Sequence, residues 1–266
     1  MSFSLIHAEN GVKYFKSDII PVRHGFSTRV GGVSREAHTE SLNLAFGRGD
    51  ERETVLANLR LFSAAVGVDS GSIISRPQIH SARVVYADET MRGEGYFHET
   101  AEGCDGYVTD REGVTLGVKT ADCVPILFCE PDSHIIGAVH AGWRGTASGI
   151  AAECVRMMAT LGASPENIRA AIGAAIHACC YEVGEDFYDS VSSLAGGDMA
   201  REFIRSCDGS LHADIVGMNR RILLESGLDG ANIDVCEKCT CCEPSLFFSH
   251  RASHGVRGTM LSVISL

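Results

Sequence analysis

Residues 118–146 read VKTADCVPILFCEPDSHIIGAVHAGWRGT, in which two apolar runs flank the turn sequence EPDS. Both runs are short and rich in β-branched residues, so they predict two strands of a β-hairpin. The first run is apolar at odd and even positions alike, which is typical of a central strand covered on both faces. The stretch therefore predicts a buried hairpin at the centre of a sheet.

A thiol and an imidazole stand at the two ends of this hairpin. With Pro131 and Asp132 as the turn, Cys123 lies opposite His140, and their Cβ atoms are about 4.5–5.5 Å apart. At that spacing the two side chains can share a metal ion or a proton. A metal site and a cysteine nucleophile activated by histidine therefore both stay open at this point.

Strand and helix patterns alternate along the rest of the chain. Apolar residues at helical spacing predict helices over residues 51–67, 148–162, 185–197 and 213–227, with Asp50 and Glu53 as a capping box for the first. Further strands are predicted over residues 106–110, 114–120, 168–176, 233–236, 246–250 and 258–266. The fold class predicted is α/β (α+β), a mixed β-sheet sandwich flanked by helices, in a single domain over residues 1–266.

Composition narrows the classes of function. The formal net charge of −11 argues against nucleic acid and anionic membranes as partners, although a local basic pocket still permits a small ligand. The sequence shows no secretory signal and no run of 18 apolar residues, and its 11 cysteines then indicate reduced thiols. We expect a cytoplasmic protein, and nothing in the sequence indicates an obligate protein partner.

A catalytic zinc usually takes three protein ligands and leaves a fourth position open. His80, in the sequence RPQIHSARVV at a boundary between loop and strand, is the best third ligand beside Cys123 and His140.

Seven motifs together resemble those of the laccase-domain family, also called the YfiH-like or multicopper polyphenol oxidase family. They occur in order from residue 24 to the C-terminus: HGFSTRVGGVS, QIHS, DGYVTD, LGVKTADCVPILF, GAVHAGWRGT, CCYEVG and LFFSHR. The resemblance implies a metal bound by His80, Cys123 and His140, usually zinc and sometimes copper. It also implies a purine nucleoside phosphorylase that converts adenosine, inosine, guanosine or methylthioadenosine, with adenosine deamination in the same pocket.

The resemblance further implies that Arg29, Asn43, Asp122 and Arg144 line the pocket, and the reaction suggests roles for them and for Lys119. Arg29 and Arg144 are candidates for binding phosphate, because a guanidinium grips oxyanions at two points, and Lys119 offers a point charge. Asp122 is the candidate for moving a proton during deamination, or for holding a metal-bound histidine. Asn43 either binds ribose or base or stabilises its own turn. The predicted catalytic residues are thus Asp122, Cys123 and Arg144, and the predicted substrate-binding residues are Arg29, Asn43, Lys119 and Arg144.

The chain departs from the family pattern at two places. Ala174 and Ala178 replace prolines and His177 replaces a glycine, while Thr259 stands where an arginine is common. A third feature is the cysteine-rich segment 236–242. It has C-x₂-C spacing but no second, separately spaced pair, which makes it a weak signal for a zinc ribbon, and the obvious cysteines to complete such a site are those at residues 179–180. Both segments are left outside the predicted metal site.

Three rival functions remain. A polyphenol oxidase or other copper oxidoreductase fits the family's older name, but none of the 11 histidines forms an H-x-H pair of the kind a multicopper centre uses. A cysteine hydrolase or amidase acting on peptidoglycan precursors would use Cys123 as its nucleophile. A nucleotide-binding regulator would bind nucleosides without forming product.

Overall fold

The hairpin predicted from the sequence lies at the centre of the molecule. Its strands are β8 (Val124–Glu130) and β9 (Ile135–Ala141), and all 14 of their residues are buried. Successive side chains of β8 enter different clusters, since Ile126 packs in one apolar core and Leu127 in another. Both faces of the hairpin are therefore covered, as the sequence predicts.

The computed structural model describes residues 3–266, and its strands form three sheets. The first sheet has the order β1 (Phe3–His7), β2 (Lys13–Ser17), β3 (Arg23–Ser27), β15 (Met260–Ser265), β7 (Thr115–Thr120) and β4 (Ile73–Ile74). The second has the order β14 (Ile233–Val235), β10 (Arg169–Ile172), β8, β9, β6 (Gly106–Thr109) and β5 (Val84–Tyr86). The third contains β11 (Glu182–Val183), β13 (Ser210–Ala213) and β12 (Ile204–Cys207).

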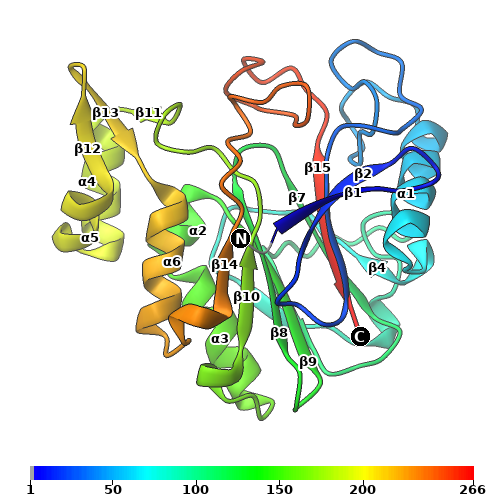
Figure 1. Cartoon of the computed structure of the whole chain (residues 1–266), viewed down its shortest axis with the longest axis horizontal. Helices are drawn as coiled ribbons and strands as arrows, with labels where there is room; N and C mark the ends of the chain where they lie inside the picture. Colours follow the sequence, from blue (N-terminus) through cyan, green and yellow to red (C-terminus); the bar gives the residue numbers. More distant parts are fainter. Residues whose placement is uncertain (1–2) are drawn as a thin grey trace.

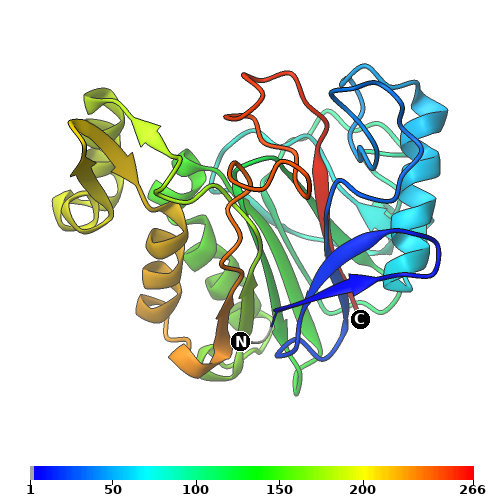
Figure 2. The same cartoon turned by 45° about the horizontal axis from the view of Figure 1, so that its top comes forward.

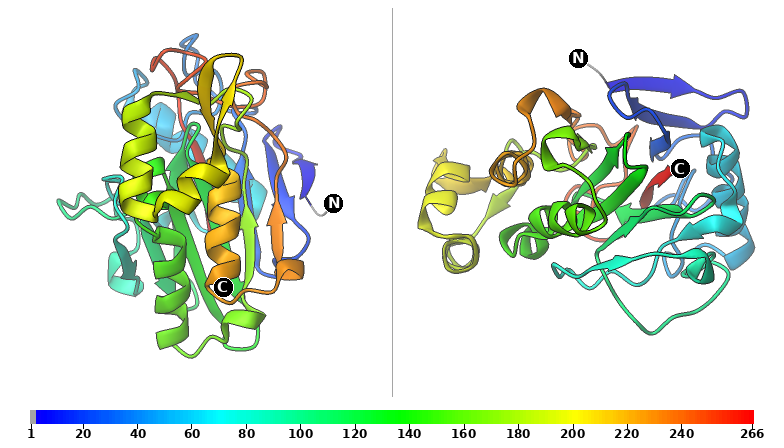
Figure 3. Two further views of the ribbon diagram at one scale, coloured as in Figure 1. Left: turned by 90° about the vertical axis from the view of Figure 1, so that its left-hand side faces the viewer. Right: turned by 90° about the horizontal axis from the view of Figure 1, so that it is seen from below.

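Six α-helices accompany the sheets in the described chain: α1 (Arg52–Val66), α2 (Trp143–Ala147), α3 (Ile150–Thr160), α4 (Glu185–Ala195), α5 (Gly197–Phe203) and α6 (Ile215–Glu225). Short 3₁₀ helices cover Ser70–Ser72, Glu89–Met91, Pro165–Asn167 and Gly230–Asn232. In Figure 1 and in the right panel of Figure 3, α3 and α6 lie on one side of the two large sheets and α1 on the other. Helices α4 and α5 and the third sheet form a lobe at one edge, which faces the viewer in the left panel of Figure 3. No helix among residues 3–266 combines the length and the apolar character that crossing a bilayer requires.

Three apolar clusters hold these layers together. One joins the second sheet to α3 and α6, a second lies between the two large sheets, and a third joins the first sheet to α1. Strand β15 contributes side chains to two of these clusters, one on each of its faces. Leu261 and Val263 face α1, while Met260 and Ile264 face the other sheet. The layers are therefore helix, sheet, sheet and helix, which confirms the predicted sandwich.

The register of the central hairpin differs from the prediction by two residues. His140 lies opposite Pro125 rather than opposite Cys123, and the connection spans residues 131–134. The carboxylate of Glu130 accepts hydrogen bonds from the backbone N–H groups of the two residues after Pro131, at 3.1 and 2.9 Å, which stabilises this longer turn. Because the shift is even, it preserves the face on which each side chain lies.

Two local predictions were wrong. Residues 246–250 form an irregular loop rather than a strand, and Phe247 and Phe248 are apolar because they fill the core between the sheets from this loop. The capping box of α1 does not form, since Glu51 occupies the N-cap without a side-chain hydrogen bond. Asp50 accepts hydrogen bonds from the side chains of Ser34, Thr39 and Asn43 instead.

Candidate functional site

The three residues predicted as metal ligands lie together at the end of the hairpin opposite its turn. His80 comes from the loop between β4 and β5, Cys123 directly precedes β8, and His140 lies near the end of β9. Their ligand atoms are all within 4.8 Å of one another. Two imidazoles and one thiol at this spacing are a donor set that suits zinc, and also copper.

Asp105 connects two of these residues and directly precedes β6. Its buried Oδ1 accepts a hydrogen bond from Nδ1 of His140 at 2.9 Å and from the backbone N–H of His80 at 3.0 Å. Its Oδ2 accepts from the backbone and the hydroxyl of Ser81, at 2.7 and 2.8 Å, and from the backbone of Ile79 at 3.2 Å. Nδ1 of His140 therefore carries the proton in this pair, and Nε2 is the nitrogen left for a metal.

The charges of this group are coupled. Burial alone would raise the pKa of Asp105, but hydrogen bonds from His140 and Ser81 outweigh it and lower the pKa. Burial alone would lower the pKa of His140, but the neighbouring Cys123 and the Asp105 carboxylate raise it to about 9. The pocket thus favours an ionised carboxylate beside the imidazole.

The backbone around the three predicted ligands is tightly constrained. His80 and Asp122 both adopt positive φ, at 56° and 90°, which few residues other than glycine do. A Cβ at Gly142 would lie 2.7 Å from Nδ1 of His80 and 3.4 Å from Sγ of Cys123. Glycine at this position therefore allows the imidazole of His80 to lie close to the backbone of residue 142.

Asp122 does not contact the histidines, in contrast to the role of histidine partner suggested from sequence. Its Oδ1 accepts a hydrogen bond from the hydroxyl of Thr240 at 2.6 Å, and its Oδ2 accepts from the backbone N–H of Arg251 at 2.7 Å. Its carbonyl accepts from the backbone of Ile176 at 2.9 Å. These bonds anchor the turn that carries Cys123, and Asp105 is the partner of His140.

A cavity of about 280 Å³ opens beside the three ligands, which form part of its wall. Three cationic side chains, Arg48, Lys119 and Arg257, also line it, and none of them forms an ion pair with a carboxylate among residues 3–266. The loops that close over this end, residues 28–50 and 242–258, gather at the top of the molecule in Figure 2.

The cations of this cavity repel one another. Burial, followed by the charge of Arg48, lowers the pKa of Lys119 to about 8. The same two causes lower the pKa of Arg257, whose buried Nε has no hydrogen-bond partner within the described chain. An anion in the cavity would relieve this repulsion.

Two of these cations were not predicted from the sequence. Arg48 lies in the stretch GRGD and Arg257 in GVRGTM, so each stands next to glycine. Glycine-rich surroundings also mark Arg29 and Arg144, and this feature could have indicated Arg48 and Arg257 as well. Thr259, one of the departures from the family pattern, also lines the cavity, and its hydroxyl accepts a hydrogen bond from Nη1 of Arg257 at 2.8 Å.

The structure separates the predicted substrate-binding residues. Lys119 lines the cavity, and its Nζ donates a hydrogen bond to the carbonyl of Ser75 at 3.1 Å. Arg144 lies on the other side of His80 and Cys123, where it lines a smaller cavity of about 130 Å³.

Arg29 and Asn43 do not line the larger cavity. The guanidinium of Arg29 donates to the carbonyls of Glu40 and Pro244, at 2.8 and 2.9 Å. Asn43 is fully buried and bonds the backbone of Ala45 as well as that of Thr259. Both residues therefore hold loops around the site.

Comparison with known proteins identifies the family. The family model described as "Multi-copper polyphenol oxidoreductase laccase" matches residues 23–266, almost the whole chain. The chain belongs to this laccase family.

Relatives and solved structures in the laccase family resemble the chain over most of its length. Purine nucleoside phosphorylase YlmD of Geobacillus stearothermophilus is 37% identical over 243 residues, which cover 90% of this chain and 88% of that protein. Adenosine deaminase RL5, from an unknown prokaryotic organism, is 35% identical and the match covers 85% and 87%. The crystal structure of the Bacillus licheniformis hypothetical protein YfiH superposes with a TM-score of 0.90 at 32% identity and covers 98% of both chains. Two of these laccase-family relatives are thus named for purine nucleoside reactions.

Proposed function

We propose that this chain is a zinc-dependent purine nucleoside phosphorylase, which converts adenosine, inosine, guanosine or methylthioadenosine and phosphate into the base and a ribose 1-phosphate. The names of the relatives support the reaction class. One observation carries the proposal for this chain: the three possible metal ligands and three unpaired cations line the same cavity. A net charge of −11 makes such a local concentration of positive charge more significant.

The cations supply the phosphate site of this proposal. Arg257 offers the free Nε–H of its guanidinium, and Lys119 and Arg48 add positive charge around the same space. A guanidinium binds two oxygens of an oxyanion at once, whereas an ammonium acts as a point charge. The three side chains together would hold phosphate in place for attack at C1′ of the ribose.

The remaining wall of the cavity suits the nucleoside. Phe46 contributes an aromatic face on which a purine can pack. Zinc bound by His80, Cys123 and His140 would supply a Lewis acid beside the reacting atoms. Asp105 retains its hydrogen bond to Nδ1 of His140, so that the imidazole keeps one orientation throughout the reaction.

We propose adenosine deamination as a second activity of the same pocket, because one relative is named for it. In this proposal Asp122 anchors the turn of Cys123 rather than moving a proton, since both of its oxygens already accept hydrogen bonds. Arg144 lines the smaller cavity, and its guanidinium lies 4.3 Å over the ring of Trp143.

A panel of purine nucleosides, each assayed with and without phosphate on protein of known zinc content, tests the proposal. Release of the free base that requires phosphate supports a phosphorylase, and an equal rate of base release without phosphate contradicts it. Arg257→Gln is expected to raise the KM for phosphate by at least tenfold, because it removes a charged hydrogen bond of about 1.5–3 kcal/mol. Arg156→Gln, a matched change at an exposed arginine of α3 that pairs with Glu153, is expected to leave this KM within twofold.

The same preparation separates the rival functions. A cysteine hydrolase would keep full activity without metal and lose it on alkylation of Cys123, whereas the proposed enzyme loses activity with its zinc. A polyphenol oxidase would consume oxygen with phenolic substrates when loaded with copper. A regulator would bind nucleosides at saturation and release no product.

A further inference from the structure

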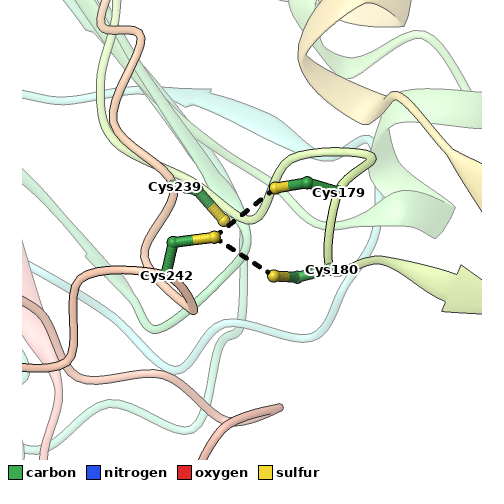
Figure 4. Close-up of side chains that lie close together, drawn as sticks. All are labelled: Cys179, Cys180, Cys239 and Cys242. Atoms are coloured by element: carbon green, nitrogen blue, oxygen red, sulfur yellow. Dashed lines mark hydrogen bonds between the residues drawn. The ribbon is translucent and has the colours of Figure 1, made fainter.

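Four cysteine thiols gather about one point, outside the site described above. This four-cysteine cluster consists of Cys179, Cys180, Cys239 and Cys242 (Figure 4). The first two residues precede β11 and the last two lie between β14 and β15, so that segments 63 residues apart meet here. All four are free thiols, and their sulfur atoms lie within 4.8 Å of one another.

We propose that the four-cysteine cluster binds a second, structural Zn²⁺ ion. Sulfur atoms around a tetrahedral zinc are about 3.8 Å apart, given a Zn–S bond of about 2.3 Å. Sγ of Cys242 lies 3.6 Å from Sγ of Cys179 and 3.3 Å from Sγ of Cys180, so that small movements would suffice to form such a site. Each thiol that binds the ion releases its proton to solvent.

The local backbone presents the sulfurs in the way a zinc site requires. Cys239 and Cys242 have the spacing C-x₂-C, which is typical of one half of a structural zinc site. Cys179 and Cys180 are consecutive, but a turn closed by the carbonyl of His177, which accepts from two backbone N–H groups at 2.9 and 3.0 Å, directs both toward Cys242 (Figure 4).

Nearby donors offset the negative charge that four thiolates would bring. The backbone N–H of His177 donates a hydrogen bond to Sγ of Cys239 at 3.5 Å. Arg251 lies beside the cluster, where its guanidinium donates to the carbonyl of Cys180 at 3.1 Å and to that of Glu182 at 2.9 Å. Such groups stabilise metal-bound thiolates without taking part in coordination.

The position of the cluster gives the second ion a role in the first site. Thr240 lies next to Cys239, and its hydroxyl donates the 2.6 Å hydrogen bond to Asp122. Its backbone N–H binds the carbonyl of Ala175, whose neighbour Ile176 bonds the carbonyl of Asp122. An ion that joins the two segments therefore fixes two of the three contacts that anchor the turn of Cys123.

Zinc content per chain tests this inference without reference to any reaction, so it can fail or hold independently of the proposed function. In protein purified with a reductant and saturated with zinc, the wild type is expected to hold two ions. The double change Cys179→Ser with Cys242→Ser is expected to leave one ion, and so is Cys123→Ser, which removes a ligand of the other site. Cys241→Ser, a matched change outside the cluster, should still hold two zinc ions per chain. Its melting temperature should be higher than that of the double variant. Two ions in the double variant, or a single wild-type ion that Cys123→Ser removes, would overturn the inference.

Alkylation of the wild-type protein provides a test that needs no variant. With a reductant present, zinc-saturated protein is treated with iodoacetamide and the modified cysteines are mapped by mass spectrometry. Cys179 and Cys242 are expected to be protected by zinc and modified after chelation, whereas exposed Cys207 reacts in both states. Equal reaction of all three with zinc present contradicts the inference, and so does a disulfide within the cluster.

Discussion

Asp105→Asn tests the way in which the chain positions its proposed metal ligands. The carboxylate is fully buried, and each of its oxygens accepts at least two hydrogen bonds from residues 79–81 and 140. An amide of the same shape must turn its NH₂ group toward one of these sets of donors. Whichever orientation it takes, at least two donors lose their acceptor.

The expected cost follows from this count. A hydrogen bond to a charged group contributes about 1.5–3 kcal/mol, so two lost bonds destabilise the metal-free protein by about 3–6 kcal/mol. For a chain of this size that lowers the melting temperature by at least about 6 °C. Loss of the bond to Nδ1 of His140 also frees the imidazole to turn, which reduces zinc affinity by about 10–100-fold.

Two assays measure these effects separately. Thermal unfolding in the presence of a chelator reports stability, and competition with a chromophoric chelator reports zinc affinity. Asp132→Asn, in the exposed turn of the central hairpin, is the control and should change neither quantity. A variant at Asp105 with wild-type melting temperature and zinc affinity within twofold of wild type would refute the role assigned to this carboxylate.

Three further predictions concern the ligands and the cavity. Gly142→Ala should reduce zinc affinity by at least tenfold, since the added Cβ lies 2.7 Å from Nδ1 of His80. Gly71→Ala is the control and should leave zinc affinity unchanged, because the atom nearest to its added Cβ is 3.5 Å away. Equilibrium zinc titration compares the two variants. The KM for phosphate should rise as pH increases through about 8, because Lys119 loses its positive charge there, and Lys119→Arg should abolish this rise; an unchanged pH profile in that variant would count against the phosphate site. Thr259→Val removes one of the two acceptors of Nη1 of Arg257, the other being the carbonyl of Gly258, and should raise the same KM about 2–12-fold in steady-state assays. No change would show that the bond to Thr259 does not position the guanidinium.

The apolar pattern of the sequence predicts the layers well because burial is periodic. Residues 126–129 alternate between two cores, as a strand covered on both faces must. The pattern fails at residues 246–250, where a loop rather than a strand fills the core, and periodicity cannot distinguish the two.

The metal ligands could be proposed from the sequence because they flank recognisable strands, but their partners could not. Asp105 reaches His140 across the pairing of β6 with β9, and nothing in the local sequence encodes that contact. Arg48 and Arg257 meet in one cavity although more than 200 residues separate them. Arg29 has the same glycine-rich surroundings and instead binds two carbonyls, which shows that local composition does not decide where a guanidinium points.

The most direct test of the proposed function is ³¹P NMR of the zinc-loaded protein with adenosine and phosphate. We predict a ribose 1-phosphate resonance that grows in step with adenine, and neither product after zinc is removed. Adenine that accumulates without ribose 1-phosphate, or inosine as the sole product, would contradict it.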